Sequence, residues 1–288
     1  MANPAFMRLG LVQDAPVVRD IESTLLQIER YAAEAGRHGR QVNLLAYPEL
    51  YVTGYFPEYW ERRPTPQDEL DWLARLQDTA SREDIWIIFG HPSYRAETVE
   101  HGTSRYGVNM TGDGLDWPMY NAASLVSPEG LVGTYAKVHL FGREAESFVP
   151  GDVFPVWETP WGRLAVQICF DIEFPEGSRI VGLNGAQIIL FPADNMHPFG
   201  SWHQTFTAAR ALENRAFVAT VNRLGPELDT DFCGGSCCMH PTGRWLIEAQ
   251  PEPGLYVCDL NLSQLADLDD AIDYYRLRRP GLYGDMVK

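Results

Sequence analysis

The sequence predicts an α/β fold, and three observations lead to this prediction. Short apolar runs typical of buried strands alternate along the chain with segments in which apolar residues recur at helical spacing. Apolar residues make up 45% of the 288 residues, which is enough for a substantial core. No repeat, low-complexity tract or internal boundary interrupts the alternation. We therefore expect one domain over residues 1–288.

In the first half of the chain, the strands are recognised as apolar runs and the helices by their periodicity. Apolar residues recur every three or four positions between Ile21 and Ala32, which is typical of an amphipathic helix. The sequence from Ser127 to Gly130 is a good turn and predicts a hairpin. The polar, glycine-rich segment 102–119 is expected to be a long loop. The expected strands are 7–13, 42–46, 85–90, 121–126 and 131–139, and the expected helices are 21–35 and 68–83.

The second half continues the same alternation. Residues 151–161 follow Pro150 and contain two further prolines, so they are expected to form a rigid connection. Residues 276–288 are expected to be an extended tail, and its apolar Leu277, Leu282 and Tyr283 indicate a subunit contact. The expected strands are 164–168, 187–191, 216–222, 234–241, 244–249 and 254–260, and the expected helices are 176–183, 202–214 and 263–273.

Charge and cysteine content limit the partners and the compartment. The chain has 39 acidic and 23 basic residues, a formal net charge of −16, which disfavours nucleic acid and anionic membranes as partners. No apolar run approaches the about 20 residues of a membrane span, and the first residues lack the layout of a signal peptide. Five cysteines, an odd number, indicate free thiols in a reducing compartment. We therefore expect a cytoplasmic protein.

One stretch, residues 162–176, is the strongest candidate to carry a catalytic residue. The apolar run from Leu164 to Ile168 reads as a buried strand that stops at Cys169, and a helix can begin at Glu176. A cysteine at such a strand-to-helix turn has its sulfur lifted out of the sheet, near backbone N–H groups that can receive an anion. This pattern favours a nucleophile. The alternative is that Cys169 is a small buried hydrophobe, as most unpaired cysteines are.

Two charged residues also follow expected strands. Glu49 lies just past the strand 42–46, and Lys137 lies near the end of the strand 131–139. Ligands bind at such strand ends in open α/β sheets. Nucleophilic catalysis at a carbonyl or nitrile needs a nucleophile, a proton acceptor and a stabiliser of negative charge, and these residues could supply all three. A nearby lysine ammonium is expected to favour the Cys169 thiolate. The alternatives are a solvated loop glutamate and an edge-strand lysine.

Three spaced blocks resemble the signature blocks of the nitrilase superfamily of carbon–nitrogen hydrolases, in the order of that family. These blocks are Tyr47-Pro48-Glu49-Leu50, Tyr135-Ala136-Lys137-Val138-His139-Leu140-Phe141 and Ile168-Cys169-Phe170-Asp171. The resemblance runs nearly end to end. It implies a four-layer α-β-β-α sandwich that dimerises through its helical face, and we expect a homodimer or a higher even homo-oligomer. It also implies an enzyme without a cofactor.

The resemblance also implies roles for the matching residues. Cys169 would attack the substrate carbon and form a thioester, and Glu49 would act as the general base and acid. Lys137 and the backbone N–H of Phe170 would hold the oxyanion. Many members of the superfamily have a second glutamate after the lysine. Glu144 fits its spacing better than Glu146, although either could instead be a solvated loop carboxylate.

The expected substrate class rests on positions that differ from the pattern of other branches of the family and on one loop. Phe170-Asp171 stands where true nitrilases usually have Trp-Glu, and the segment 192–199 resembles that of amidases acting on small carboxamides. Glu173 stands where several branches, such as the ω-amidases, carry arginine, which weakens any inferred preference for acidic substrates. We expect a small carboxamide, with Tyr55, Asn195 and Met196 as substrate contacts.

Other readings remain open at this point. A nitrile is one alternative substrate. An N-carbamoyl (ureido) acid is another, and its carboxylate would need a cation such as Arg210 or Arg215. A catalytically silent binding protein on the same scaffold is a more distant alternative. A metal site is not expected, because Cys233, Cys237, Cys238 and His240 lie in one short segment without the paired spacing of structural zinc.

Overall fold

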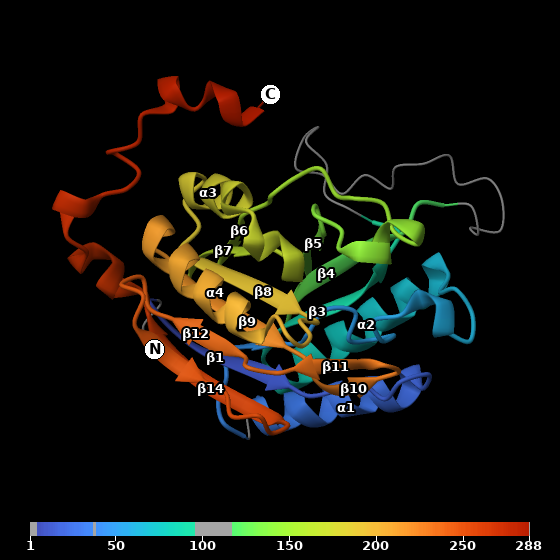
Figure 1. Ribbon diagram of the computed structural model, residues 1–288. Helices are drawn as coiled ribbons and strands as arrows, with labels where there is room; N and C mark the ends of the chain where they lie inside the picture. The colour runs from blue at the N-terminus through green and yellow to red at the C-terminus, as the bar shows by residue number, and fades with distance from the viewer. Residues whose placement is uncertain (1–4, 37–38, 96–116, 288) are drawn as a thin grey trace.

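Two six-stranded sheets pack face to face, and helices cover their outer faces, so the chain forms four layers (Figure 1). This architecture comes from a computed structural model that describes residues 5–36, 39–95 and 117–287. The order of layers is helix, sheet, sheet, helix, as the resemblance implied.

The first sheet is built from the first half of the chain and one late strand. Its strands β1, β2 and β3 are parallel, whereas β14, β4 and β5 pair antiparallel with their neighbours. The order across the sheet is β14 (Gly254–Asn261), β1 (Phe6–Gln13), β2 (Leu44–Ala46), β3 (Trp86–Ser93), β4 (Tyr120–Ser127) and β5 (Gly130–Ala136).

The second sheet repeats this pattern. Its strands β7, β8 and β9 are parallel, and β6, β12 and β13 pair antiparallel. The order is β13 (Trp245–Glu248), β12 (Cys237–Met239), β9 (Phe217–Asn222), β8 (Ile188–Ala193), β7 (Gly162–Val166) and β6 (Trp157–Thr159). A separate hairpin consists of β10 (Leu224–Glu227) and β11 (Thr230–Cys233).

Strand alternation explains the layers, because successive side chains of a strand point to opposite faces. Leu44 on β2 and Leu164 on β7 belong to the core between the sheets. Leu45, the next residue on β2, packs on the side of helices α1 (Ile21–Ala35) and α2 (Pro66–Glu83). Ala165, the next residue on β7, packs on the side of α3 (Pro175–Leu183) and α4 (Gly200–Asn214).

Local signals explain where the long helices begin. Asp20 caps α1 by accepting a hydrogen bond from the backbone N–H of Ser23. Thr65 and Asp68 form a reciprocal capping box at the start of α2, where Pro66 occupies the first turn. Such caps satisfy backbone N–H groups that have no partner within the helix.

Three expectations for secondary structure were wrong or incomplete. The predicted helix 263–273 is replaced by two short 3₁₀ segments, Leu262–Asp267 and Asp270–Ile272, because Leu268 is extended between them and breaks the helical ladder. The predicted connection 151–161 contains strand β6, and the hairpin of β10 and β11 was not foreseen. Most of the expected loop 102–119 lies outside the described residues.

The remaining short helices are 3₁₀ turns. Those before β8 are Pro57–Tyr59, Gly142–Glu146 and Cys169–Glu173, and those in the tail are Pro280–Leu282 and Gly284–Val287. The tail leaves the body of the sandwich and ends beyond α3 in Figure 1. Leu277 and Leu282 on it are more than half exposed. No helix in the described ranges is long and apolar enough to cross a membrane.

Candidate active site

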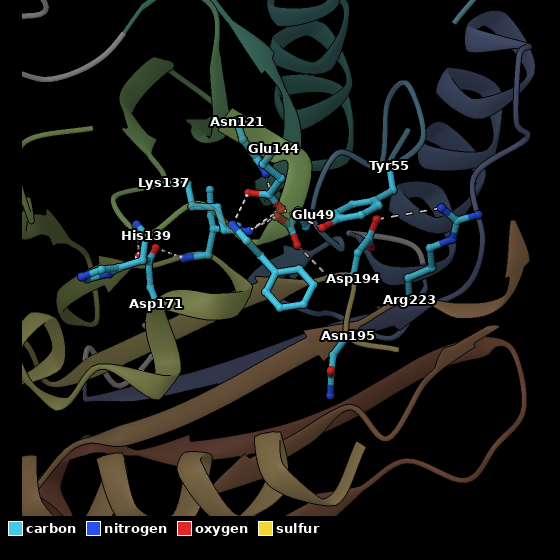
Figure 2. Close-up of polar contacts among 12 residues, drawn as sticks. Glu49, Tyr55, Asn121, Lys137, His139, Glu144, Asp171, Asp194, Asn195 and Arg223 are labelled. Atoms are coloured by element: carbon cyan, nitrogen blue, oxygen red, sulfur yellow. Dashed lines mark hydrogen bonds and ion pairs between the residues drawn. The ribbon is translucent and has the colours of Figure 1, made fainter. Parts of the chain in front are cut away.

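Polar residues that follow four different strands meet at one edge of the sandwich. Glu49 follows β2, Lys137 follows β5, Cys169 follows β7 and Asp194 follows β8. Glu49 is hydrogen-bonded to both Lys137 and Asp194. Figure 2 shows the charged side chains gathered around Glu49. Glu49, Lys137 and Cys169, which the sequence analysis placed at strand ends, therefore lie at one edge although they come from both sheets.

Glu49 is a buried carboxylate that only accepts hydrogen bonds. Its Oε1 accepts from Lys137 Nζ at 2.6 Å and from Asn121 Nδ2 at 2.6 Å, and its Oε2 accepts from the backbone N–H of Asp194 at 3.1 Å. Burial raises the pKa of Glu49 above its ordinary value, and the Lys137 ammonium opposes that rise. Three donors, one of which is the Lys137 ammonium, favour the ionised form, which is the form a general base needs.

The turn that carries Glu49 is tightly constrained by its neighbours. Leu50, the next residue, has a φ of +43°, a left-handed conformation that is rare for a side chain of its size. A Cβ at Gly90 on β3 would collide with the backbone of Pro48 and Leu50. Glycine at position 90 therefore lets this turn pack directly against β3 and fixes the direction of the Glu49 side chain.

Lys137 bridges two buried glutamates. Its Nζ lies 2.6 Å from Glu49 Oε1 and 2.8 Å from Glu144 Oε1, and its side chain is completely buried. Burial by itself would lower the pKa of Lys137, but the charges of Glu144 and Glu49 outweigh burial and raise it well above its ordinary value. The ammonium therefore keeps its charge.

Glu144, and not Glu146, lies at the site. Glu144 Oε1 accepts hydrogen bonds from Lys137 Nζ and from the Tyr55 hydroxyl, both at 2.8 Å. Its Oε2 accepts from the backbone N–H of Phe141 at 3.1 Å. Glu146, in contrast, is exposed and pairs with Arg143. The spacing argument that preferred Glu144 agrees with this arrangement.

Cys169 sits at a strained turn. Its φ is +44°, and it begins the 3₁₀ segment Cys169–Glu173 that leads into α3. Burial and the negative charge of Glu49 raise the pKa of Cys169 well above its ordinary value, and Lys137 only partly offsets them. Lys137 acts in the expected direction, because its charge lowers the pKa of the thiol, but burial and Glu49 outweigh it. The thiol is neutral at rest and must lose its proton as it attacks.

Asp171 joins the cysteine turn to the strand of Lys137. Its Oδ2 accepts from the backbone N–H of Ile168 at 2.9 Å and from the Tyr135 hydroxyl at 2.8 Å. Its Oδ1 accepts from the backbone N–H of His139 at 2.9 Å and lies 2.8 Å from His139 Nδ1. The sequence analysis used Asp171 only as a family marker. Here it is a buried clamp between β7 and β5.

A second buried ionic group was missed by the sequence analysis. Arg223 follows β9, is fully buried, and pairs closely with Glu227. Its Nη1 also lies 3.9 Å from Asp194 Oδ2. Glu227 Oε2 accepts from the backbone N–H of Tyr55 at 3.3 Å. Arg223 could have been found from the sequence, because it directly follows an expected strand, and Glu49 and Lys137 were recognised by that same feature.

A cavity of about 160 Å³ opens beside Cys169. The predicted substrate contacts Tyr55, Asn195 and Met196 all line it. Its wall is mainly apolar and aromatic. The other lining residues are Phe141, Phe170, Glu173, Asp194, Phe199, Trp202 and His203.

The two arginines considered for a ureido substrate do not line this cavity. Arg210 Nε donates to the backbone carbonyl of Ile172 at 2.9 Å, and its Nη1 pairs with Glu213. Arg215 donates to the backbone carbonyls of residues 268 and 269. Both arginines therefore bind backbone carbonyls outside the cavity wall and do not face a substrate. Within the described ranges, no group of three or more His, Cys, Asp or Glu residues could hold a metal ion.

Comparison with known proteins identifies the family of this chain and a solved structure with a similar fold. The sequence matches the carbon–nitrogen hydrolase family over residues 8–269. The chain belongs to that family. The α/β sandwich is confirmed as well, because this carbon–nitrogen hydrolase resembles the crystal structure of an amidase from Nesterenkonia sp. with a TM-score of 0.81 and 28% identity, over 99% of this chain and 98% of the other.

The relatives include amidases and a nitrilase. This hydrolase is 31% identical to an (R)-stereoselective amidase of Pseudomonas sp., over 98% of this chain and 95% of the relative. It is 32% identical to a nitrilase of Pyrococcus abyssi, over 96% of this chain and 99% of the relative. In one structure of the Nesterenkonia amidase, with 28% identity to this chain, the acetamide moiety of fluoroacetamide is added covalently to the active-site cysteine.

Proposed function

We propose that this hydrolase converts a small carboxamide to a carboxylic acid and ammonia through a thioester on Cys169. The observation that carries the proposal is that the buried thiol of Cys169 lies within the electrostatic influence of Glu49, a carboxylate that accepts hydrogen bonds from Lys137 and Asn121. This arrangement supplies both a nucleophile and an acceptor for its proton.

In the first half of the reaction, Cys169 Sγ attacks the carbonyl carbon while its proton passes to Glu49. The carbonyl oxygen gains negative charge, which Lys137 Nζ and the backbone N–H of Phe170 stabilise. Glu49 then gives the proton to the amide nitrogen, the carbon–nitrogen bond breaks, and ammonia leaves. An acyl thioester remains on Cys169.

In the second half, Glu49 accepts a proton from water, whose oxygen attacks the thioester carbon. The carbon–sulfur bond breaks, the sulfur regains its proton from Glu49, and the acid leaves. Glu144 does not exchange protons in this scheme. It accepts a hydrogen bond from the same Lys137 Nζ as Glu49 does, and the Tyr55 hydroxyl donates to Glu144 in turn. Glu144 is thus a positioning residue.

Two observations favour a carboxamide over the alternatives. Among the described residues that line the cavity, none is lysine or arginine, so the carboxylate of an N-carbamoyl acid would meet no cation there. Phe170-Asp171 also departs from the Trp-Glu of true nitrilases. The Nesterenkonia and Pseudomonas relatives, both named as amidases, support the same branch.

Ammonia release from three matched compounds tests the proposal. Butyramide, butyronitrile and N-carbamoyl-β-alanine would be compared by kcat/KM, with Cys169→Ala as the blank. We expect butyramide to be preferred by at least about tenfold, or about 1.4 kcal/mol of transition-state binding. A tenfold preference for the nitrile or the ureido acid would overturn the assignment.

We further propose a cytoplasmic homodimer. Ile180 and Leu183 on α3 and Leu212 on α4 are each at least 40% exposed, and the tail carries further exposed apolar residues. Such surface is typical of a subunit contact. All five cysteines are free, which suits a reducing compartment. Light scattering should give a mass twice that of the chain, and a monomer at micromolar concentration would contradict the dimer.

A further inference from the structure

We propose that Glu173 makes this site select amides whose acyl part carries a positive charge, such as β-amino amides, and reject amides whose acyl part is anionic. The inference rests on the proposed amidase function and adds to it a class of substrate. It is carried by the charge of the cavity wall and by the aromatic rings around it.

Glu173 offers an uncommitted carboxylate to the cavity. It lines the cavity that opens at Cys169, four residues away in sequence. Among the described residues no hydrogen bond or ion pair engages its side chain, and burial alone shifts its pKa, upward. The nearby Arg210 contacts the backbone carbonyl of Glu173, at 3.4 Å from Nη2, and gives its Nη1 to Glu213. The carboxylate is therefore available to a ligand.

No described group on the cavity wall supplies a compensating positive charge. His203 lines the cavity, but burial, together with the charge of Lys137, lowers its pKa to about 3, so its ring is neutral at physiological pH. Asp194 also lines the wall, but burial raises its pKa well above its ordinary value and so disfavours its negative charge, which leaves Glu173 as the carboxylate offered to a ligand. Lys137 is held by two glutamates of its own. Among the described residues that line the cavity, none offers an anionic acyl group a positive charge, and Glu173 repels it.

The rest of the wall suits an ammonium group. Phe141, Phe170, Phe199 and Trp202 all line the cavity. Aromatic ring faces carry partial negative charge and attract cations, most strongly in sites shielded from water. An aromatic wall with one carboxylate is a surface on which an ammonium binds and a carboxylate is repelled.

Three amides of nearly equal size and different charge test the inference. They are β-alaninamide, which is cationic, butyramide, which is neutral, and succinamate, which is anionic. In the wild-type enzyme we expect kcat/KM to fall in that order, with about tenfold between the cationic and neutral compounds. The Glu173→Gln variant should lose this tenfold ratio. The Glu173→Arg variant should hydrolyse succinamate faster than β-alaninamide.

Glu176→Gln is the matched control. It removes one negative charge three residues away, at an exposed position of α3 that does not line the cavity, and should keep the wild-type ratio. A ratio that survives in Glu173→Gln, or a wild-type preference for succinamate, would overturn the inference while leaving the amidase function in place. If the wild type hydrolyses none of the three amides, the proposed function fails and the inference fails with it.

Discussion

The two sheets have the same strand pattern but contribute different chemistry. The first sheet places Glu49, Lys137 and Asn121 at its edge, and these groups form a buried ionic network. The second sheet places Cys169 at the same edge, next to a cavity whose wall is largely aromatic. One sheet thus supplies the proton acceptor and the positive charge, and the other supplies the nucleophile and most of the wall that meets the substrate.

This difference separates reaction from selectivity. The ionic network is buried and its groups satisfy one another, so it can be preorganised before a substrate arrives. Glu173 and the rings of the wall instead face a cavity and have free surface for a ligand. We therefore expect changes in the first sheet's network to lower turnover for every amide. Changes in the wall should alter the relative rates of different amides.

The largest effect is expected from removing the nucleophile. Cys169→Ala should lower kcat for butyramide by at least about a thousandfold, because no other described thiol lines the cavity. Cys258→Ala, which changes a buried cysteine on β14, is the control and should retain activity. Circular dichroism melts would show that both variants fold. Wild-type turnover in Cys169→Ala would refute the mechanism.

Loss of the cation should come next. Lys137→Ala removes the charge that stabilises both Glu49 and the oxyanion, so kcat should fall by about a hundredfold or more with a smaller change in KM. Lys137→Arg should not restore the rate, because the planar guanidinium cannot replace a compact ammonium between two carboxylates. Arg143→Ala, an exposed neighbour, serves as the control. A near-normal kcat in Lys137→Arg would argue against a direct role.

Glu144 and Glu146 form a natural pair for a smaller effect. Glu144→Gln keeps the shape of the side chain but removes one of the two charges that hold Lys137, so kcat should fall by about tenfold. Glu146→Gln changes an exposed carboxylate and should leave kcat unchanged. Steady-state kinetics would compare the kcat of the two variants with that of the wild type. Equal rates for the two variants would show that Glu144 is dispensable.

The smallest effect concerns the pH dependence of alkylation. Because the pKa of Cys169 is raised, iodoacetamide should label it slowly at neutral pH and faster as the pH rises. Glu49 contributes to this raised pKa, so Glu49→Gln should shift the midpoint of labelling to lower pH. Lys137 opposes it, so Lys137→Ala should shift the midpoint to higher pH. Shifts in the reverse directions would contradict the assigned electrostatics.

The sequence was sufficient for the parts of the molecule that local patterns encode. Glu49, Lys137 and Cys169 each follow an apolar strand, and the alternation of strands and helices predicted the α/β class, whereas the four layers were implied by the family resemblance. Contacts between segments distant in sequence were not accessible in this way. Arg223 and Asp194 meet only because β9 and β8 are neighbours in the folded sheet, and their pairing leaves no local mark.

Two further properties depend on burial, which only the fold reveals. The sign of the pKa shift at Cys169 depends on how burial compares with two opposing charges, and burial is known only from the fold. The predicted helix 263–273 has few positions that pack on the core: Leu265 is partly buried against it, whereas Ile272 is 55% exposed. The periodicity of apolar residues did not reveal that this segment has little core surface on which a helix could pack.

Trapping the thioester tests the central claim most directly. Wild-type enzyme would be mixed with excess butyramide, quenched in acid within the first turnover, and analysed by intact mass and peptide mapping. We expect the mass of a butyryl group on the peptide that contains Cys169, absent from Cys169→Ala. Turnover without an adduct at any quench time, or an acyl group on another residue, would contradict a mechanism through Cys169.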